Sequence, residues 1–318
     1  MKKKVLIIFL LLITLSGCTK RFTVEGDDKS KKQYVSNIIC KPETKAQQEI
    51  YEANKDKLLE DNVDYDKLPR CKNLKINSGG YEGLWTSIFV KPLAWIIIKV
   101  GLLVKSNGLA IMIIGFLLRA LMFPLSKKST NMSENMKKAQ KDLDALERKY
   151  KGKDDKESMM AKSQEMMMIY KKHNISPMSG CLFTFLQLPI FFAFLEAVYR
   201  VPAFFENKFL IYNLGTTPME GISAGNYYYI ILVVIIIAAT YFSFKNMNMS
   251  GNEEQAKQMK MMSTFMVVFI SVISFSLPTS IALYWIVSNG FTIIQNMILI
   301  QCQVACLHSY NYQYSLHF

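Results

Sequence analysis

No Asp, Glu, Lys or Arg follows Lys260 in this chain of 318 residues, so its last 58 positions carry none of these groups. A water-soluble fold needs charged groups spread over its surface, and this stretch cannot supply them. Hydrophobic residues make up 51% of the sequence, with only 15 Gly and 6 Cys, which excludes disordered, collagen-like and disulfide-scaffold chains. The sequence therefore predicts an all-α polytopic membrane protein.

The N-terminus has the pattern of a secretory signal. Three lysines precede an apolar run from Val5 to Leu15, which is too short to cross a membrane. The run continues into Leu15-Ser16-Gly17-Cys18, which resembles a bacterial lipobox. We therefore expect residues 1–17 to be a lipoprotein signal peptide and Cys18 to be lipidated, with the mature N-terminus outside the cell. An ordinary signal with a chance cysteine is the alternative.

The next segment, 18–82, is polar and is expected to be the lipid-anchored exoplasmic part of the chain. Between residues 19 and 83 there are 13 Lys+Arg and 12 Asp+Glu, and periodic apolar residues are few. This pattern predicts a partly helical, mobile segment. Cys40 and Cys71 form a disulfide in an oxidising compartment and stay free thiols in a reducing one. The sequence leaves both possibilities open.

Six apolar stretches follow, and whether five or six of them cross the membrane decides the topology. They lie at 85–104, 108–126, 180–200, 227–244, 263–279 and 280–301. The first contains Lys91 and Lys99 and is followed by Lys105, and these lysines share roughly 120° of helical arc. Such an arc is typical of a helix that lies in the membrane interface with its amines toward water.

The distribution of basic residues favours five spans. Loop 127–173 has 13 Lys+Arg and 8 acids, whereas loop 203–226 has a single lysine. The positive-inside rule therefore places 127–173 in the cytoplasm. Because Cys18 is expected outside, we predict an interfacial helix at 83–105 and a five-span core at 106–301. The remaining residues, 302–318, form a cytoplasmic tail.

Loop 127–173 has the pattern of two antiparallel helices. Its first half carries an apolar seam at spacings of four and three residues, typical of a coiled-coil face: Met132, Met136, Ala139, Leu143, Leu146 and Tyr150. A polar turn at 151–155 ends that helix, and a second helix is expected from about Glu157 to His173. Five methionines on the second helix favour a surface that accepts varied apolar chains: Met159, Met160, Met166, Met167 and Met168. The alternative is that they are the hairpin's own core.

Arg119 is the one charged residue of the stretch 108–126, about a dozen residues from its outer end. A cation at mid-bilayer costs roughly 2.5–3.5 kcal/mol, so it should face a wet cavity or a partner. The only acid in the apolar stretches is Glu196, which lies near the outer end of its span, where it can reach outward to water. We therefore expect Arg119 to face a cavity and not a carboxylate.

Polar residues in two other spans are candidates to line the same cavity. Thr184 and Gln187 precede Pro189 in the second span. One face of the last span carries polar residues at spacings of three and four, with Asn289 at its flank: Trp285, Ser288, Thr292 and Gln295. Such stripes often only join helices through hydrogen bonds. The polar residues of both spans are expected in the same hydrocarbon core as Arg119, and this coincidence favours a binding role.

Enzyme chemistry has no matching motif in this sequence. It lacks a Gly-rich phosphate loop, a His-Glu-x-x-His zinc helix and a Gly-x-Ser-x-Gly elbow. Cys302 and Cys306 have no His or acid partner, so they make a poor metal site. We expect no catalytic residue, no metal and no cofactor apart from the covalent lipid, palmitate included, on Cys18.

Several short motifs between about 83 and 301 resemble the YidC-type membrane protein insertases of the Oxa family, in their Gram-positive lipoprotein form. The motifs are Phe89-Val90-Lys91-Pro92-Leu93, Leu118-Arg119-Ala120 with Phe123-Pro124-Leu125, Lys149-Tyr150-Lys151-Gly152-Lys153, Tyr170 to Pro177, Gly180-Cys181-Leu182, Gln187-Leu188-Pro189-Ile190-Phe191 and Leu283 to Asn289. The resemblance implies five spans around a hydrophilic groove that opens to the cytoplasm and to lipid. It places Arg119, Gln187 and Trp285 in that groove. The long segment 19–83 and a tail without basic residues depart from the family pattern.

The leading hypothesis is a cell-membrane insertase that inserts and helps fold nascent membrane proteins, alone or with the Sec translocon and the translating ribosome. Membrane lipid is a further partner, and no direct nucleic-acid recognition is expected. A channel or secondary transporter with an anion site at Arg119 is the alternative, although the sequence shows no internal repeat of its spans. A lipoprotein receptor that works through its exoplasmic part is a third possibility.

Overall fold

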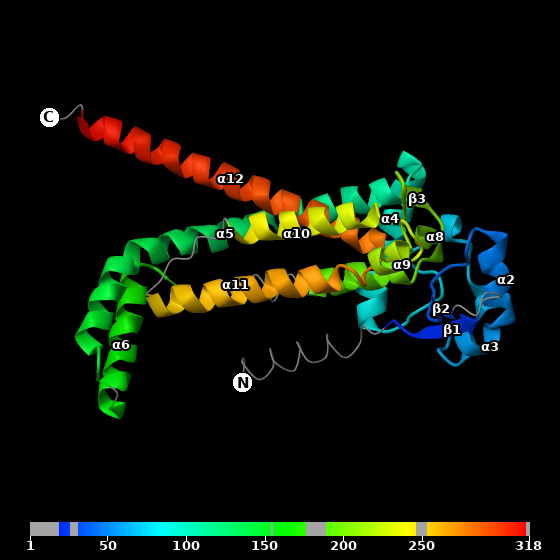
Figure 1. Ribbon diagram of the computed structural model, residues 1–318, viewed down its shortest axis with the longest axis horizontal. Coiled ribbons are helices and arrows are strands. Elements are labelled where there is room, and N and C mark those ends of the chain that lie inside the picture. The colour runs from blue at the N-terminus through cyan, green and yellow to red at the C-terminus, as the bar shows by residue number, and fades with distance from the viewer. Residues whose placement is uncertain (1–18, 26–30, 154, 176–188, 246–252, 316–318) are drawn as a thin grey trace. The chain divides into compact units, whose positions relative to one another are not determined.

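The computed structural model describes residues 19–25, 31–153, 155–175, 189–245 and 253–315 (Figure 1). Cys18 and Gln187, two of the residues singled out by the sequence, lie outside these ranges. The chain divides into two compact units. The first contains Met1–Gly115, Leu186–Ile230 and Ser276–Tyr284, and the second contains Phe116–Phe185, Ile231–Phe275 and Trp285–Phe318.

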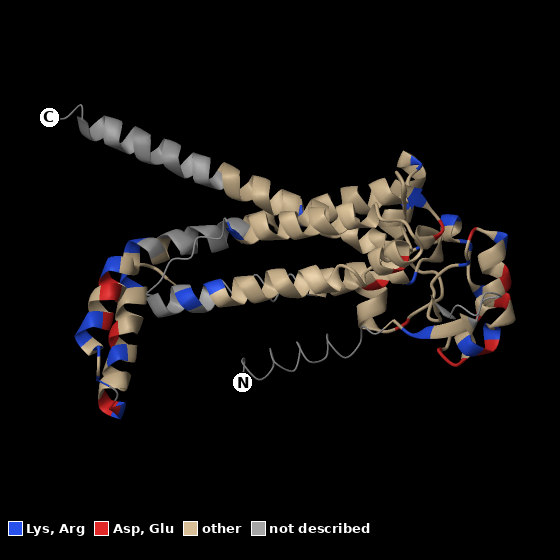
Figure 2. Ribbon diagram, viewed as in Figure 1, with Lys and Arg blue, Asp and Glu red and all other residues tan. Residues whose placement is uncertain are grey.

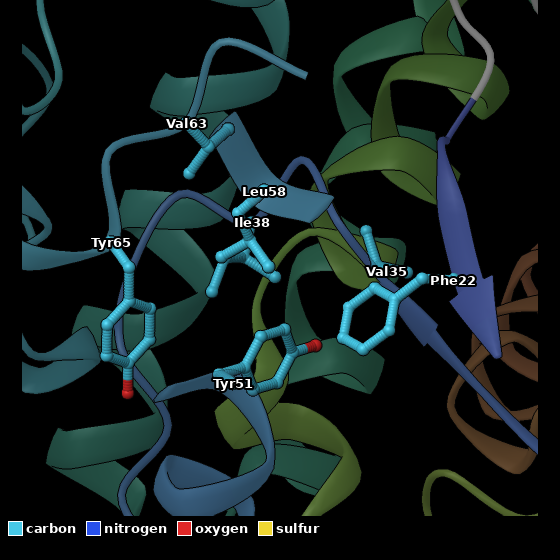
Figure 3. Close-up of a cluster of buried hydrophobic side chains, with 7 residues drawn as sticks. All are labelled: Phe22, Val35, Ile38, Tyr51, Leu58, Val63 and Tyr65. Carbon is cyan, nitrogen blue, oxygen red and sulfur yellow. The ribbon is translucent and has the colours of Figure 1, made fainter. Parts of the chain in front are cut away.

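The N-terminal segment, defined here as residues 19–83, is a packed part of the first unit. Its strands β1 (Arg21–Glu25) and β2 (Lys31–Val35) pair antiparallel, and short helices follow: α2 (Lys45–Ala53), α3 (Lys55–Leu59), η1 (Tyr65–Lys67) and η2 (Cys71–Asn73). These elements enclose a core of buried apolar side chains (Figure 3): Phe22, Val35, Ile38, Tyr51, Leu58, Val63 and Tyr65. The prediction of a mobile segment is therefore wrong, because aromatic residues spread thinly along the sequence gather in one core.

A disulfide joins Cys40 to Cys71 within this segment. It settles the choice that the sequence left open. The bonded cysteines are buried, and the chain beside them forms a bridge between Lys41 and Arg70. The disulfide therefore ties the start of η2 to the chain that leads into α2.

A single turn of π-helix, η3 (Thr86–Val90), continues directly into α4 (Lys91–Val104). Lys91 does not point toward water as the sequence predicted, because its side chain is only 2% exposed. Its ammonium lies 2.8 Å from the Glu82 carboxylate and donates to the carbonyls of Ser78 and Gly80 at 2.8 and 2.7 Å. A helical wheel gives the direction of the lysine but not the partners that a preceding loop can bring to it. Lys99 and Lys105 are exposed, in agreement with the prediction.

The other apolar stretches also form helices. Residues 108–126 lie in α5 (Asn107–Tyr150), and the helix Pro189–Tyr199 is the described part of stretch 180–200. The last three stretches lie in α10 (Tyr229–Lys245), α11 (Glu253–Ile273) and α12 (Thr279–Ser315). Figure 2 shows Lys, Arg, Asp and Glu concentrated on the N-terminal segment and on the region of α5 and α6, while α10 and α12 are almost free of them.

Three helices in the described residues are long and apolar enough to cross a membrane: Thr86–Val104, Asn107–Pro124 and Thr279–Ile298. Pro189–Tyr199, Tyr229–Lys245 and Lys260–Ile273 are apolar but shorter. Length and composition thus make the chain a helical membrane protein, as predicted. They place α4 among the helices that could span, whereas its lysines and the distribution of basic residues predict an interfacial helix.

Short elements connect the helices of the first unit. They are α8 (Pro202–Phe205), the two-stranded sheet of β3 (Lys208–Phe209) and β4 (Tyr212–Asn213), and α9 (Pro218–Ser223). Thr217 caps α9 through a reciprocal pair of hydrogen bonds with Glu220. The amide N–H of Thr279 donates to the carbonyl of Thr216 at 3.1 Å, so this loop contacts the start of α12.

Four charged side chains of the first unit, Glu82, Lys91, Glu196 and Arg200, form what we call the ion cluster. Arg200 contacts Glu196 at 3.2 Å and also pairs with Glu82. The prediction that Glu196 reaches outward to water is wrong, because only 3% of the residue is exposed. Burying a charge without a partner is costly, so two cations and two carboxylates within one cluster satisfy each other.

Candidate functional site

Arg119 lies on α5 twelve positions after the first residue of the helix, which corresponds to about 18 Å along its axis. This depth is near the middle of a hydrocarbon core that is about 30 Å thick. The side chain is half-buried, and its Nε–H donates to the hydroxyl of Ser288 on α12. Ser288 itself is buried. The structure therefore brings together two of the predicted site residues from helices far apart in the sequence.

The remaining residues of the predicted stripe share the same helix as Ser288. Gln295 is buried, whereas Trp285 and Thr292 are half-buried. The hydroxyl of Thr292 donates to the carbonyl of Ser288 at 3.0 Å, so it satisfies the backbone of its own helix. One turn before Arg119, Phe116 packs edge-on against Phe291 with ring centroids 5.1 Å apart, which adds an apolar contact between α5 and α12.

Asn289, at the flank of the stripe, acts as a contact between helices. Its side-chain amide donates to the hydroxyl of Thr240 on α10 at 3.0 Å, and both residues are buried. This is the helix-joining role that such polar residues often have in membranes. Thr240 was not among the predicted site residues, although a lone threonine in the otherwise apolar run from Tyr229 to Phe242 was a usable signal.

A second candidate site is the pair of helices formed by the C-terminal half of α5 and α6 (Lys156–Lys172), which we call the α5–α6 hairpin. The predicted seam is confirmed at its described side chains. Ala139 and Leu143 are buried with Tyr170 and Ile175, and Met136, Met166 and Ile169 pack against them. Leu146 is also buried. The predicted turn is present, with Gly152 in the left-handed region at a φ of 78°.

The methionines of α6 divide between the two interpretations. Met159, Met160, Met167 and Met168 are exposed, as a capture surface requires. Met166 packs against the hairpin core, as the alternative predicts. A groove of about 520 Å³ runs between the two helices and is lined by Asp142, Ala145, Leu146, Lys149, Glu165, Met168, Ile169 and Lys172.

Ion pairs hold the two helices of the hairpin together at its surface. Lys149 contacts Glu165 at 2.6 Å, and Lys172 contacts Asp142 at 2.8 Å. The hydrogen bond from Lys172, together with one from His173, lowers the pKa of the Asp142 carboxyl below its usual value. The groove therefore has apolar walls with charged rims of both signs. Within the described residues, no three His, Cys, Asp or Glu side chains lie close enough to hold a metal ion.

Comparison with known proteins connects this architecture to a family. A family model described as 60Kd inner membrane protein matches residues 99–305, which is more than half of the chain. A membrane protein insertase YidC from Oceanobacillus iheyensis is 31% identical over 220 residues, covering 69% of this chain and 84% of that protein. The chain belongs to the YidC family of membrane protein insertases.

A second curated relative is similar over the same part of the chain. The membrane protein insertase MisCA of Bacillus subtilis is 33% identical over 219 residues, covering 68% of this chain and 78% of the relative. A crystal structure described as an active YidC insertase with its first transmembrane domain resolved aligns at 27% identity with a TM-score of 0.49, covering 70% of this chain and 48% of that one. The family match includes Arg119, Ser288 and the whole α5–α6 hairpin, and it excludes the whole of the N-terminal segment.

Proposed function

We propose that this chain inserts nascent membrane proteins through a hydrophilic groove that contains Arg119, and that the activity is not enzymatic. Family membership supports the insertase activity. The observation that supports the site is the hydrogen bond between Arg119 and Ser288, which orients a guanidinium at mid-bilayer depth on the polar face of α12. Trp285, Thr292 and Gln295 continue this face, and Gln187 is proposed as a further groove residue.

The proposed mechanism follows from the free energy of moving charge into hydrocarbon. A polar or acidic segment of a client protein cannot enter lipid cheaply, but an arginine already present at mid-depth offers it a partner. Attraction to Arg119 draws that segment partway across the membrane. Burial of the client's apolar helix in lipid then drives completion, since it removes apolar surface from water.

We further propose the topology and partners of the chain. Cys18 carries a covalent lipid at the outer leaflet, the N-terminal segment is exoplasmic, α4 lies in the interface, and the α5–α6 hairpin and the C-terminus are cytoplasmic. The chain receives clients from translating ribosomes and works alone or with the Sec translocon.

Substitution of Arg119 tests the groove mechanism. We expect Arg119→Ala to lose insertion of single-span clients that carry acidic exoplasmic segments, and Arg119→Lys to retain part of it. Ser288→Ala is the matched control, because it removes one hydrogen-bond partner of Arg119 but keeps the charge. The assay is protease protection of radiolabelled clients in cells lacking any paralogue. Wild-type insertion of every client by Arg119→Ala would exclude the mechanism.

Direct contact with clients is tested by crosslinking. A photoreactive residue at position 119, 187 or 285 should label stalled nascent membrane proteins. Position 234, an exposed valine of α10, serves as the control on another helix. Solute flux through purified protein in vesicles without any client would instead favour a channel or transporter.

A cysteine introduced at Met160 tests the topology. An impermeant thiol reagent should modify it only after the cells are opened if α4 lies in the interface. Modification in intact cells would show that α4 spans the membrane. Mass spectrometry of the purified chain tests the lipid on Cys18, which Cys18→Ser should abolish.

A further inference from the structure

Two apolar residues form the turn between β3 and β4, and we call Leu210 and Ile211 the β3–β4 tip. Two-residue hairpin turns favour Gly, Asn or Asp, because these residues tolerate positive φ. Leu210 has a φ of 54°, so a branched apolar side chain occupies a backbone conformation that glycine adopts without strain. The folding of the turn itself therefore does not explain why these residues are present.

The tip is exposed while the strands beside it are packed. Leu210 is 80% exposed and Ile211 is 57% exposed. The flanking Phe209 lies so close to Gly108 that a Cβ there would come within 2.6 Å of its ring. Tyr212 is buried and packs edge-on against Tyr229. The hairpin is thus held firmly at its base, and its two apolar residues project away from the fold.

The base of the hairpin lies at the end of a membrane-spanning helix. Gly108 is the second residue of α5, whose part Asn107–Pro124 is long and apolar enough to span. The side-chain amide of Asn107 donates to the carbonyl of Ala203 at 3.0 Å, which fixes the same loop to the same point. The tip therefore lies close to the level at which α5 enters the membrane.

Charge around the tip is positive. Lys208 precedes it in β3, and Lys105 lies two residues before α5, and both lysines are exposed. The acids of the same loop are engaged elsewhere in the fold. Glu206 accepts hydrogen bonds from the amides of Glu43 and Thr44 at 3.0 and 2.9 Å, and Glu220 accepts one from the amide of Thr217, the cap of α9, at 2.9 Å. An apolar projection with a basic rim matches a lipid surface that carries anionic headgroups.

We propose that the β3–β4 tip is a lipid anchor. Leu210 and Ile211 enter the boundary between headgroups and acyl chains at the membrane face where α5 begins, and Lys105 and Lys208 contact anionic headgroups. The occupant is lipid and not a protein partner, because the base of the hairpin packs against the first residues of a helix that is long and apolar enough to span. The anchor fixes the position of the short loops of the first unit relative to the membrane surface. It depends on membrane embedding, not on insertase activity.

Photocrosslinking to lipid tests this proposal in the purified full-length chain. A photoreactive amino acid at position 211 should form lipid adducts in vesicles that contain phosphatidylglycerol, detected by mass spectrometry. Position 59 is the matched control, because Leu59 is 56% exposed but belongs to α3 of the N-terminal segment. Replacement of phosphatidylglycerol by phosphatidylcholine should lower the yield at position 211. Equal yields at both positions, or adducts only to a second copy of the chain, would overturn the proposal.

A pair of substitutions at the neighbouring position separates anchoring from folding. Leu210→Asp should reduce the lipid adducts from position 211 several-fold, because a carboxylate is repelled from anionic headgroups and from the acyl region. Leu210→Gly should keep or raise the thermal midpoint in detergent, since glycine suits the positive φ, and should also reduce the adducts. Unchanged adducts in both variants would mean that the tip does not reach lipid.

Discussion

Trp85 donates its indole N–H to the carboxylate of Glu196 at 2.8 Å, and both side chains are buried. Glu196 also contacts Arg200 one helical turn later at 3.2 Å. The contact joins the residue just before η3 to the helix Pro189–Tyr199. This apolar helix therefore has one end held by charge-assisted hydrogen bonds, which are stronger than those between neutral groups.

Removal of the Glu196 carboxylate should destabilise the first unit strongly. Glu196→Ala leaves Arg200 buried with one partner fewer, and breaking a buried ion pair costs about 3–5 kcal/mol. Glu196→Gln keeps an acceptor for Trp85 and should cost less. Thermal unfolding in detergent measures both. Lys67→Ala, which breaks the exposed Lys67–Asp64 pair, should leave the midpoint unchanged.

Acid should weaken the ion cluster through Glu82. Burial on its own would raise the pKa of the Glu82 carboxyl, but the charges of Arg200 and Lys91 and their hydrogen bonds outweigh it and hold the pKa below its ordinary value of 4.5. The contribution of Glu82 to the free energy of unfolding is therefore fully present above pH 4.5. It is lost as the pH falls through the pKa that Glu82 has in the folded protein, which lies below 4.5. Glu82→Gln should remove this part of the acid sensitivity, seen as a smaller fall in unfolding midpoint between about pH 6 and pH 3. A variant with the same pH profile as wild type would exclude the assignment.

Reduction should loosen the N-terminal segment. The Cys40–Cys71 disulfide closes a loop with a sequence separation of 31, and the loop-entropy relation gives about 3–4 kcal/mol for that length. Dithiothreitol should therefore increase hydrogen exchange in β1, β2 and α2. The Cys40→Ala/Cys71→Ala double variant should exchange faster than oxidised wild type and show no further response to the reagent.

The α5–α6 hairpin offers substitutions that separate folding from client capture. Leu143→Asp places a charge in the buried seam and should make the hairpin sensitive to protease. Met160→Gln with Met167→Gln changes two exposed side chains, so the hairpin should stay resistant while crosslinks to nascent chains weaken. If the glutamine variant becomes as protease-sensitive as the aspartate variant, these methionines stabilise the fold.

The sequence predicted those features whose cause is local. The seam of the hairpin follows from a repeat of apolar residues, and its turn from Gly152, which the structure places at positive φ. The apolar helices follow from composition in the same way. The depth of Arg119 was also predictable, because it depends only on counting along one helix.

Features that depend on distant partners were not predictable. Arg119 and Ser288 are 169 positions apart, and their contact depends on the rotation of two helices that no periodicity specifies. Lys91 and Glu196 were assigned to water because each was judged on its own helix. The partner Glu82 lies in a loop without a recognisable pattern, and the burial of Lys91, Glu196 and Arg200 becomes favourable only when the four charges meet.

The bond from Arg200 to the carbonyl of Asn37 has a consequence for synthesis. The two residues are 163 positions apart, so Asn37 leaves the ribosome long before its partner exists. At ordinary elongation rates of about 5–20 residues per second, that delay is on the order of ten seconds. During this interval the N-terminal segment lacks the hydrogen bond from Arg200 to Asn37, and Glu82 lacks its ion pair with Arg200. The stability of the N-terminal segment therefore depends on whether synthesis has passed residue 200. Quality-control proteases have a brief period in which to recognise chains that stop before that residue.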